Sequence, residues 1–120
     1  MISDLAFAGR AEEALGELRW AFGAGTAPVL IVGSFASTAR TLARLIGAPR
    51  GLRDADLAQE IGAQPWKLRQ LRALARGWDP VRMANAINAI ARADAEVKGE
   101  AVDKSYALER MVLAVSTGRA

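Results

Sequence analysis

The sequence predicts an all-α domain, a compact bundle of five or six helices that spans residues 1–120. Apolar residues recur three and four positions apart through most of the chain, which is the period of an amphipathic helix. No stretch alternates apolar and polar side chains with the period of two that a half-buried strand needs. Glycines and prolines separate the apolar stretches, as they do where helices end and begin. The length is that of one domain with its own core.

The first long helix is expected to follow a short apolar turn at residues 5–7. Its apolar side chains lie on one face, and three glutamates lie on the other. Gly23 or Gly25 supplies the left-handed residue that ends it. The apolar stripe consists of Ala11, Ala14, Leu15, Leu18, Ala21 and Phe22.

The next helix is the longest, with Pro28 in its first turn and Pro49 just beyond its end. It has the length of a membrane span, but Arg40, Arg44 and several hydroxyl residues interrupt it, which favours a core helix of a soluble protein over a membrane segment. We expect it to form a long antiparallel pair with the preceding helix, as the body of the fold.

Two more helices are expected in the second half of the chain. Asp79 followed by Pro80 starts the first of them, and Gly99 ends it. Asp103 caps the last helix, which has little polar face and must therefore be buried within the domain or against a partner. Its apolar residues are Tyr106, Ala107, Leu108, Met111, Val112, Leu113 and Val115.

Residues 56–71 have the pattern of a helix-turn-helix. Ala58 is small enough for a close helix crossing, Gly62 suits the turn, and Leu68 faces back to the first helix. The local geometry is thus well specified, but the same pattern is common in helical proteins that bind no DNA.

The net charge of +3 is concentrated around this segment, because residues 50–82 carry seven basic and four acidic side chains. Residues 65–76 contain no carboxylate, and such a basic helix meets phosphates, meets an acidic protein surface, or is merely solvated. The four cations that could make these contacts are Lys67, Arg69, Arg72 and Arg76.

Base reading requires small polar groups in the first turn of the second helix, whereas this turn carries Trp66. We expect Trp66 to pack rather than to enter a DNA groove. Trp20 and Trp78 are also expected in the core, although buried aromatics anchor subunit contacts as well.

The sequence predicts no catalytic residue, no cofactor and no metal site. It contains no histidine or cysteine, which removes the usual nucleophile, base and zinc ligands. The glycine clusters lack the lysine and spacing of a phosphate-binding loop. Asp94 lies on an apolar stripe with Lys98 four residues later, and we interpret the two as an ion pair that ties one helix to its neighbour.

Several segments together resemble one protein family. They are GAQPWKLRQL at residues 62–71, ARGW at 75–78, DAEVKG at 94–99, YALERMVL at 106–113, and DLAFAGRAEEAL at 4–15. Their order and spacing resemble the C-terminal, or collar, domain of the delta subunit of bacterial DNA polymerase III, a part of the sliding-clamp loader. The resemblance covers nearly the whole chain.

The resemblance implies an oligomerisation domain. The first ten residues lack the basic start and long apolar run of a secretory signal, so we expect a cytoplasmic protein. Collar domains of this family are α-helical and pack side by side in a ring with those of delta-prime and the gamma/tau ATPase. The resemblance also implies that this chain is a fragment of a longer AAA+-related protein, whose N-terminal domains contact the sliding clamp. Any DNA contact through the basic helix would be non-specific. The alternative is a small helix-turn-helix DNA-binding domain that uses the basic helix at residues 65–76.

Overall fold

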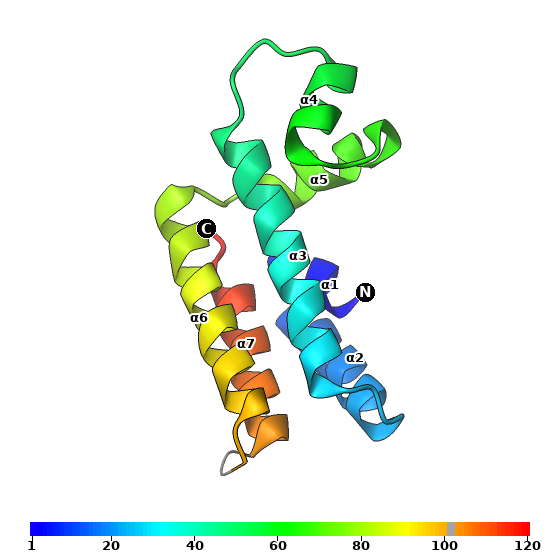
Figure 1. The fold of residues 1–120 in the computed structure, drawn as a ribbon, viewed down its shortest axis with the longest axis vertical. Helices are drawn as coiled ribbons and strands as arrows, with labels where there is room; N and C mark the ends of the chain where they lie inside the picture. The colour runs from blue at the N-terminus through cyan, green and yellow to red at the C-terminus, as the bar shows by residue number, and fades with distance from the viewer. Residues whose placement is uncertain (101–102) are drawn as a thin grey trace.

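The computed structural model describes residues 1–100 and 103–120, and over these residues it is all-helical, as predicted. It contains seven α-helices in the described residues, one more than the upper prediction, because the apolar turn near the N-terminus forms a helix of its own (Figure 1). The elements are α1 (Ile2–Phe7), α2 (Ala11–Gly23), α3 (Pro28–Gly47), α4 (Asp54–Ile61), the 3-10 turn η1 (Pro65–Lys67), α5 (Leu68–Ala75), α6 (Pro80–Lys98) and α7 (Lys104–Gly118).

The predicted start signals lie at the observed helix starts. Pro28 occupies the first turn of α3, where its missing N–H costs no hydrogen bond. The side chain of Asp79 accepts a hydrogen bond of 2.8 Å from the backbone N–H of Arg82 at the start of α6. Asp103 does the same for the N–H of Tyr106 at the start of α7. These bonds satisfy donors that the first turn of a helix otherwise leaves unpaired.

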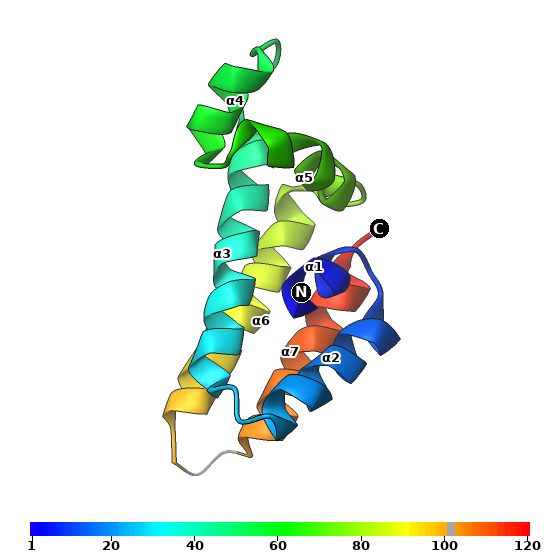
Figure 2. The same ribbon diagram turned by 90° about the vertical axis from the view of Figure 1, so that its right-hand side faces the viewer.

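The body of the fold is built on α6, which packs along both α3 and α7 (Figure 2). The predicted pairing of α2 with α3 as the body of the fold is wrong. The short helix α1 contacts α2, α3 and α7, so α2 packs mainly on α1 and α7 instead. The chain turns sharply at Gly25, but α1 occupies the space that a close α2–α3 pair would need.

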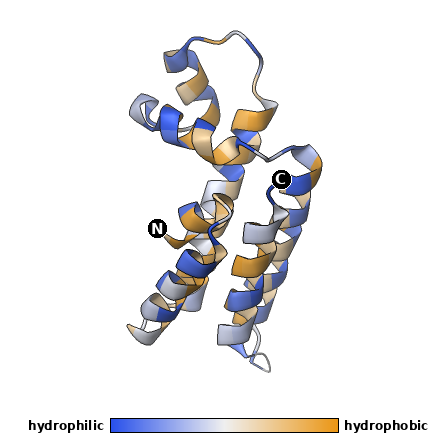
Figure 3. Ribbon diagram, turned by 180° about the vertical axis from the view of Figure 1, so that it is seen from behind, coloured by the Kyte–Doolittle hydropathy of each residue, from blue (hydrophilic) through white to orange (hydrophobic). Residues whose placement is uncertain are grey.

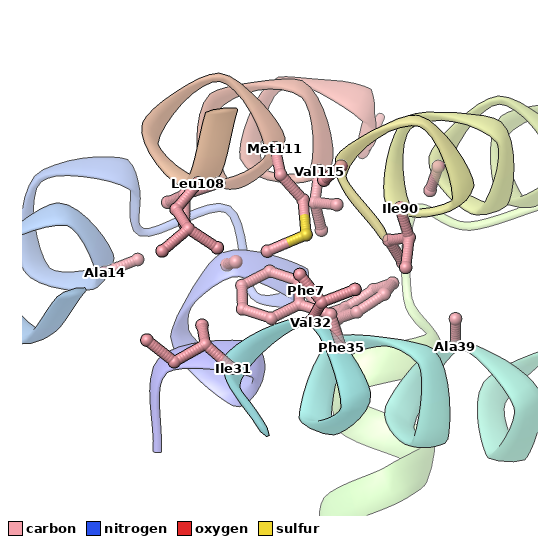
Figure 4. Close-up of a cluster of buried hydrophobic side chains, with 14 of the residues drawn as sticks. Phe7, Ala14, Ile31, Val32, Phe35, Ala39, Ile90, Leu108, Met111 and Val115 are labelled. Atoms are coloured by element: carbon pink, nitrogen blue, oxygen red, sulfur yellow. The ribbon is translucent and has the colours of Figure 1, made fainter. Parts of the chain in front are cut away.

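Phe7 on α1 is the centre of the main core (Figure 4). Its ring lies 6.3 Å from that of Phe35 and 5.3 Å from that of Trp78, measured between centroids. The indole N–H of Trp78 donates a hydrogen bond of 2.9 Å to the backbone carbonyl of Phe7. Helix α7 contributes the buried residues Ala107, Leu108, Met111, Val112 and Val115.

A second, smaller core lies at one end of the molecule, where α4 and α5 pack together and against the end of α3. It consists of Leu57, Ala58, Ile61 and Leu68, with Leu71 in contact with both cores. We refer to residues 54–75 as the α4–α5 unit. The molecule is consequently elongated, with extents of 47 × 26 × 23 Å.

Helix α3 is long and apolar enough, by length and composition alone, to cross a membrane. The buried stripe of α3 includes Ile31, Phe35 and Leu42, which pack within the main core. The core helix of a soluble protein passes the same test. Only 28% of the apolar window of α3 is buried, so packing within the domain accounts for part of its apolar character.

Candidate interaction surfaces

The turn between α4 and η1 is made by Gly62, whose φ is +72°. This left-handed conformation allows the N–H of Ala63 to donate a hydrogen bond of 2.9 Å to the carbonyl of Ala58. Ala58 and Leu68 are both buried where the two helices meet. The three residues that define the helix-turn-helix pattern thus occupy the crossing and the turn.

Replacing Gly62 with alanine is expected to lower the free energy of unfolding by about 1–2 kcal/mol, because a side chain at positive φ is strained. The added Cβ would also lie 3.3 Å from a guanidinium nitrogen of Arg44. Chemical denaturation monitored by circular dichroism measures the change. Gly16→Ala is the control, since Gly16 is inside α2 and an added Cβ there would meet open space. This substitution should raise the free energy of unfolding by about 0.5–1 kcal/mol. Equal changes in the free energy of unfolding for the two substitutions would contradict the left-handed turn at Gly62.

Trp66 does not pack in the core, and the prediction that it would is wrong. Its side chain is 74% exposed. The residue lies in the 3-10 turn η1, and Leu68 rather than Trp66 fills the contact with α4. Trp20, also expected in the core, is 74% exposed as well, so Trp78 is the one tryptophan that the core contains.

The structure separates the four predicted cations by their partners. Arg72 on α5 donates a hydrogen bond of 2.9 Å to the carboxylate of Asp54 on α4, so it joins the two helices of the α4–α5 unit. Lys67 lies with its Nζ 5.3 Å from the centroid of the Trp66 ring. In the described part of the chain, Lys67, Arg69 and Arg76 have no carboxylate within 4.0 Å.

An exposed aromatic side chain and free cations therefore meet at the start of α5. We call this the α5 surface, and it comprises Gln64, Trp66, Lys67, Arg69 and Gln70, all of which are exposed. In Figure 3 the ribbon at this end of the molecule alternates between hydrophilic and hydrophobic stretches, as expected of short amphipathic helices.

A polar cleft of about 540 Å³ adjoins the α5 surface. Hydroxyl side chains from α3 and amide side chains from the α4–α5 unit line it, together with Asp4 from α1. Gln64, Lys67 and Gln70 belong to both the cleft and the α5 surface. The cleft thus has many hydrogen-bonding groups and one carboxylate.

A second surface, which the sequence did not predict, lies where α2 leads into α3. Met1, Trp20 and Leu30 are 84%, 74% and 67% exposed around a hollow of about 280 Å³. We call these three residues the α2–α3 patch. The signal was present in the sequence, since Trp20 lies off the apolar stripe of its helix and three residues after Glu17.

A third feature is a groove of about 610 Å³ between α3 and α6. Small apolar side chains line most of it, including Ala36, Ala39 and Ala91. Arg40 and Arg44 line it from α3, and Asp94 lines it from α6.

Asp94 and Lys98 form an ion pair with an Oδ2–Nζ distance of 2.9 Å. Both residues lie on α6, so the pair joins successive turns of one helix and does not tie α6 to a neighbour, contrary to the prediction. That tie is made instead by Arg110 on α7, which donates a hydrogen bond to Glu96 on α6. This hydrogen bond raises the pKa of Arg110 above its ordinary value.

The described residues contain no group of three or more side chains of the His, Cys, Asp and Glu types that could hold a metal ion. The chain matches no family model, no curated protein and no solved structure. Among the surfaces of the described residues, the α2–α3 patch and the α5 surface contain the two exposed tryptophans, Trp20 and Trp66.

Proposed function

We propose that this chain is a non-catalytic assembly domain, the collar domain of a DNA polymerase III delta subunit. It packs beside the collar domains of delta-prime and the gamma/tau ATPase in the clamp loader that places the sliding clamp on primed DNA. The observation that carries the assembly role is the α2–α3 patch. The identity of the assembly comes from the resemblance at residues 4–15, 62–71, 75–78, 94–99 and 106–113.

The α2–α3 patch has the composition of an interface anchor. Tryptophan is enriched among the residues that contribute most to binding, and it does so when a partner removes it from water. Trp20 and Leu30 face solvent beside a hollow that Ile31 and Ala21 also line. Contiguous apolar surface of this kind is uncommon on monomers and favours a protein contact.

The segments that carry the resemblance have packing roles in this fold. YALERMVL supplies much of the buried face of α7, including Leu108, Met111 and Val112. DAEVKG ends α6 and contains the Asp94–Lys98 pair. These roles are structural, and they stabilise the fold that presents the α2–α3 patch.

The alternative, a helix-turn-helix that reads duplex DNA, is supported by the Gly62 turn and by the exposed cations of α5. It is weakened by Trp66, which occupies the turn that would present polar groups to base edges. Arg72 is also engaged by Asp54 and is directed to α4. We therefore favour assembly.

We expect the chain to form a stoichiometric complex with the collar domains of delta-prime and the gamma/tau ATPase from the same genome. Trp20→Ala should weaken this complex by about 30-fold or more, because it removes an anchor worth about 2 kcal/mol. Size-exclusion chromatography with light scattering measures the complex, and a titration measures the affinity.

Trp66→Ala is the matched control, since Trp66 is as exposed as Trp20 but lies outside the α2–α3 patch. It should leave the complex intact. A wild-type chain that elutes alone, or a Trp20→Ala variant that binds with unchanged affinity, would contradict the proposal.

A further inference from the structure

We propose that the α5 surface binds single-stranded nucleic acid, with Trp66 stacking on an unpaired base while Lys67 and Arg69 neutralise the flanking phosphates. The inference rests on the α5 surface alone and does not depend on the proposed assembly role.

The indole ring of Trp66 is free to stack on a base. Trp66 protrudes from a 3-10 turn and is largely solvent-exposed, so one ring face is accessible even though Lys67 approaches the ring. Base stacking on such a ring needs no particular base, because every base has a π-face. A duplex keeps its bases stacked on one another, which leaves no free base face for Trp66.

The charge around the Trp66 ring is positive. Lys67 is in contact with Trp66, and Arg69 follows three residues later, about one helical turn away. Neither cation has a carboxylate within 4.0 Å in the described residues. Lysine is depleted at protein interfaces, whereas an exposed aromatic side chain beside free cations is typical of a single-strand binding site.

The polar cleft adjoins the α5 surface and limits where a strand can lie. Lys67 and Gln70 lie on its wall, and Asp4 lies on the wall formed by α1. A phosphate close to Asp4 would be repelled by its carboxylate. Gln64 and Gln70, which line the cleft together with Lys67, offer amide donors to the sugar-phosphate backbone of a strand that lies along the α5 surface.

Trp20 provides an internal comparison. It has the same exposed fraction as Trp66, but it shares its surface with Glu17, and its neighbours in the α2–α3 patch are apolar. A carboxylate beside the ring disfavours a phosphate backbone. Only one of the two exposed tryptophans therefore has the surroundings that a nucleic acid needs.

The test is a titration of a labelled oligothymidylate of about 16 nucleotides with the 120-residue chain, followed by fluorescence anisotropy at low salt. Trp66→Ala is expected to weaken binding by about 5- to 100-fold, and Trp66→Phe should restore part of the affinity because it keeps a stacking ring. Trp20→Ala should bind as tightly as the unmodified chain. Circular dichroism verifies that each variant is folded.

The salt dependence tests the phosphate contacts separately. Each phosphate contact to a single strand contributes about 0.7 to the slope of log affinity against log salt concentration. Replacing both Lys67 and Arg69 with glutamine should therefore reduce that slope by about 1.4. Replacing Lys104 and Arg92, which lie outside the α5 surface, with glutamine should leave it unchanged.

Four results would overturn the inference. The first two are an absence of oligothymidylate binding by the unmodified chain and equal losses of oligothymidylate affinity in Trp66→Ala and Trp20→Ala. The third is tighter binding of a blunt duplex that Trp66→Ala does not affect. The fourth is loss of the collar-domain complex in Trp66→Ala with unchanged oligonucleotide affinity. The last result would assign Trp66 to a protein interface. The assembly role is tested by the Trp20 variants, so failure of one proposal is distinguishable from failure of the other.

Discussion

Replacing Trp78 with alanine is expected to lower the free energy of unfolding by about 3–5 kcal/mol. The side chain is buried, its ring packs on Phe7, and its indole N–H donates to the carbonyl of Phe7. Its far edge approaches the backbone of Gly118 near the end of α7. The substitution therefore leaves a cavity and also an unpaired buried carbonyl. Urea denaturation followed by circular dichroism measures the loss.

Trp66→Ala is the control, because it makes the same chemical change at an exposed position. Its free energy of unfolding should stay within about 0.5 kcal/mol of the unmodified chain. If Trp66→Ala destabilised the fold as much as Trp78→Ala, the exposed position of Trp66 would be wrong, and the proposed single-strand site would lose its stacking ring.

The burial of the three tryptophans follows only partly from the local sequence. Trp78 follows Gly77, whose φ of +79° turns the chain so that the indole returns to α1. Trp66 follows Pro65, and the local pattern predicted the helix start correctly but not the direction of the side chain. For Trp20 the helical stripe did carry the information, since Trp20 lies off the stripe. A general expectation that tryptophan is buried outweighed it.

The helix boundaries were largely predictable because their causes are local. Caps such as Asp79 and Asp103 act on backbone groups three residues away. The neighbours of a helix depend on distant residues instead. The predicted α2–α3 pair failed because α1 lies among α2, α3 and α7, a placement that no local pattern contains.

The candidate surfaces follow the same division. The cluster of cations in residues 65–76 is visible in the sequence, but the partner of each cation is not. Arg72 is engaged by Asp54, which is eighteen residues earlier in the chain, and this contact exists only after α4 and α5 have packed. In the described residues, the tertiary structure therefore leaves three of the four cations without a carboxylate partner, and two of them, Lys67 and Arg69, are close to Trp66 in the chain.

The two proposed binding surfaces lie toward opposite ends of α3. Leu30 of the α2–α3 patch is in its first turn, and the α4–α5 unit packs on its other end. Within the described residues, Trp20 and Trp66 line no common cavity, so substitutions at these two residues should have additive effects.

Replacing Ile61 with alanine is expected to cost about 2–4 kcal/mol and to loosen the α4–α5 unit before the rest of the fold. Ile61 is fully buried in the smaller core, which has only four buried members, so removing one side chain takes away much of its apolar contact. Hydrogen exchange should show lost protection in α4 and α5, with α6 and α7 largely unchanged.

The same variant separates the two proposals. With the α4–α5 unit loosened, the α5 surface loses its geometry, so oligothymidylate binding should fall while the collar-domain complex persists through the α2–α3 patch. Ile87→Ala is the control, since Ile87 is a half-exposed isoleucine on α6 and its truncation should cost about 1 kcal/mol or less. Loss of protection in α6 and α7 together with α4 would show instead that the two cores unfold as one unit. Leu71, which contacts both cores, and α3, which packs on α4 and α5, would then couple the two cores.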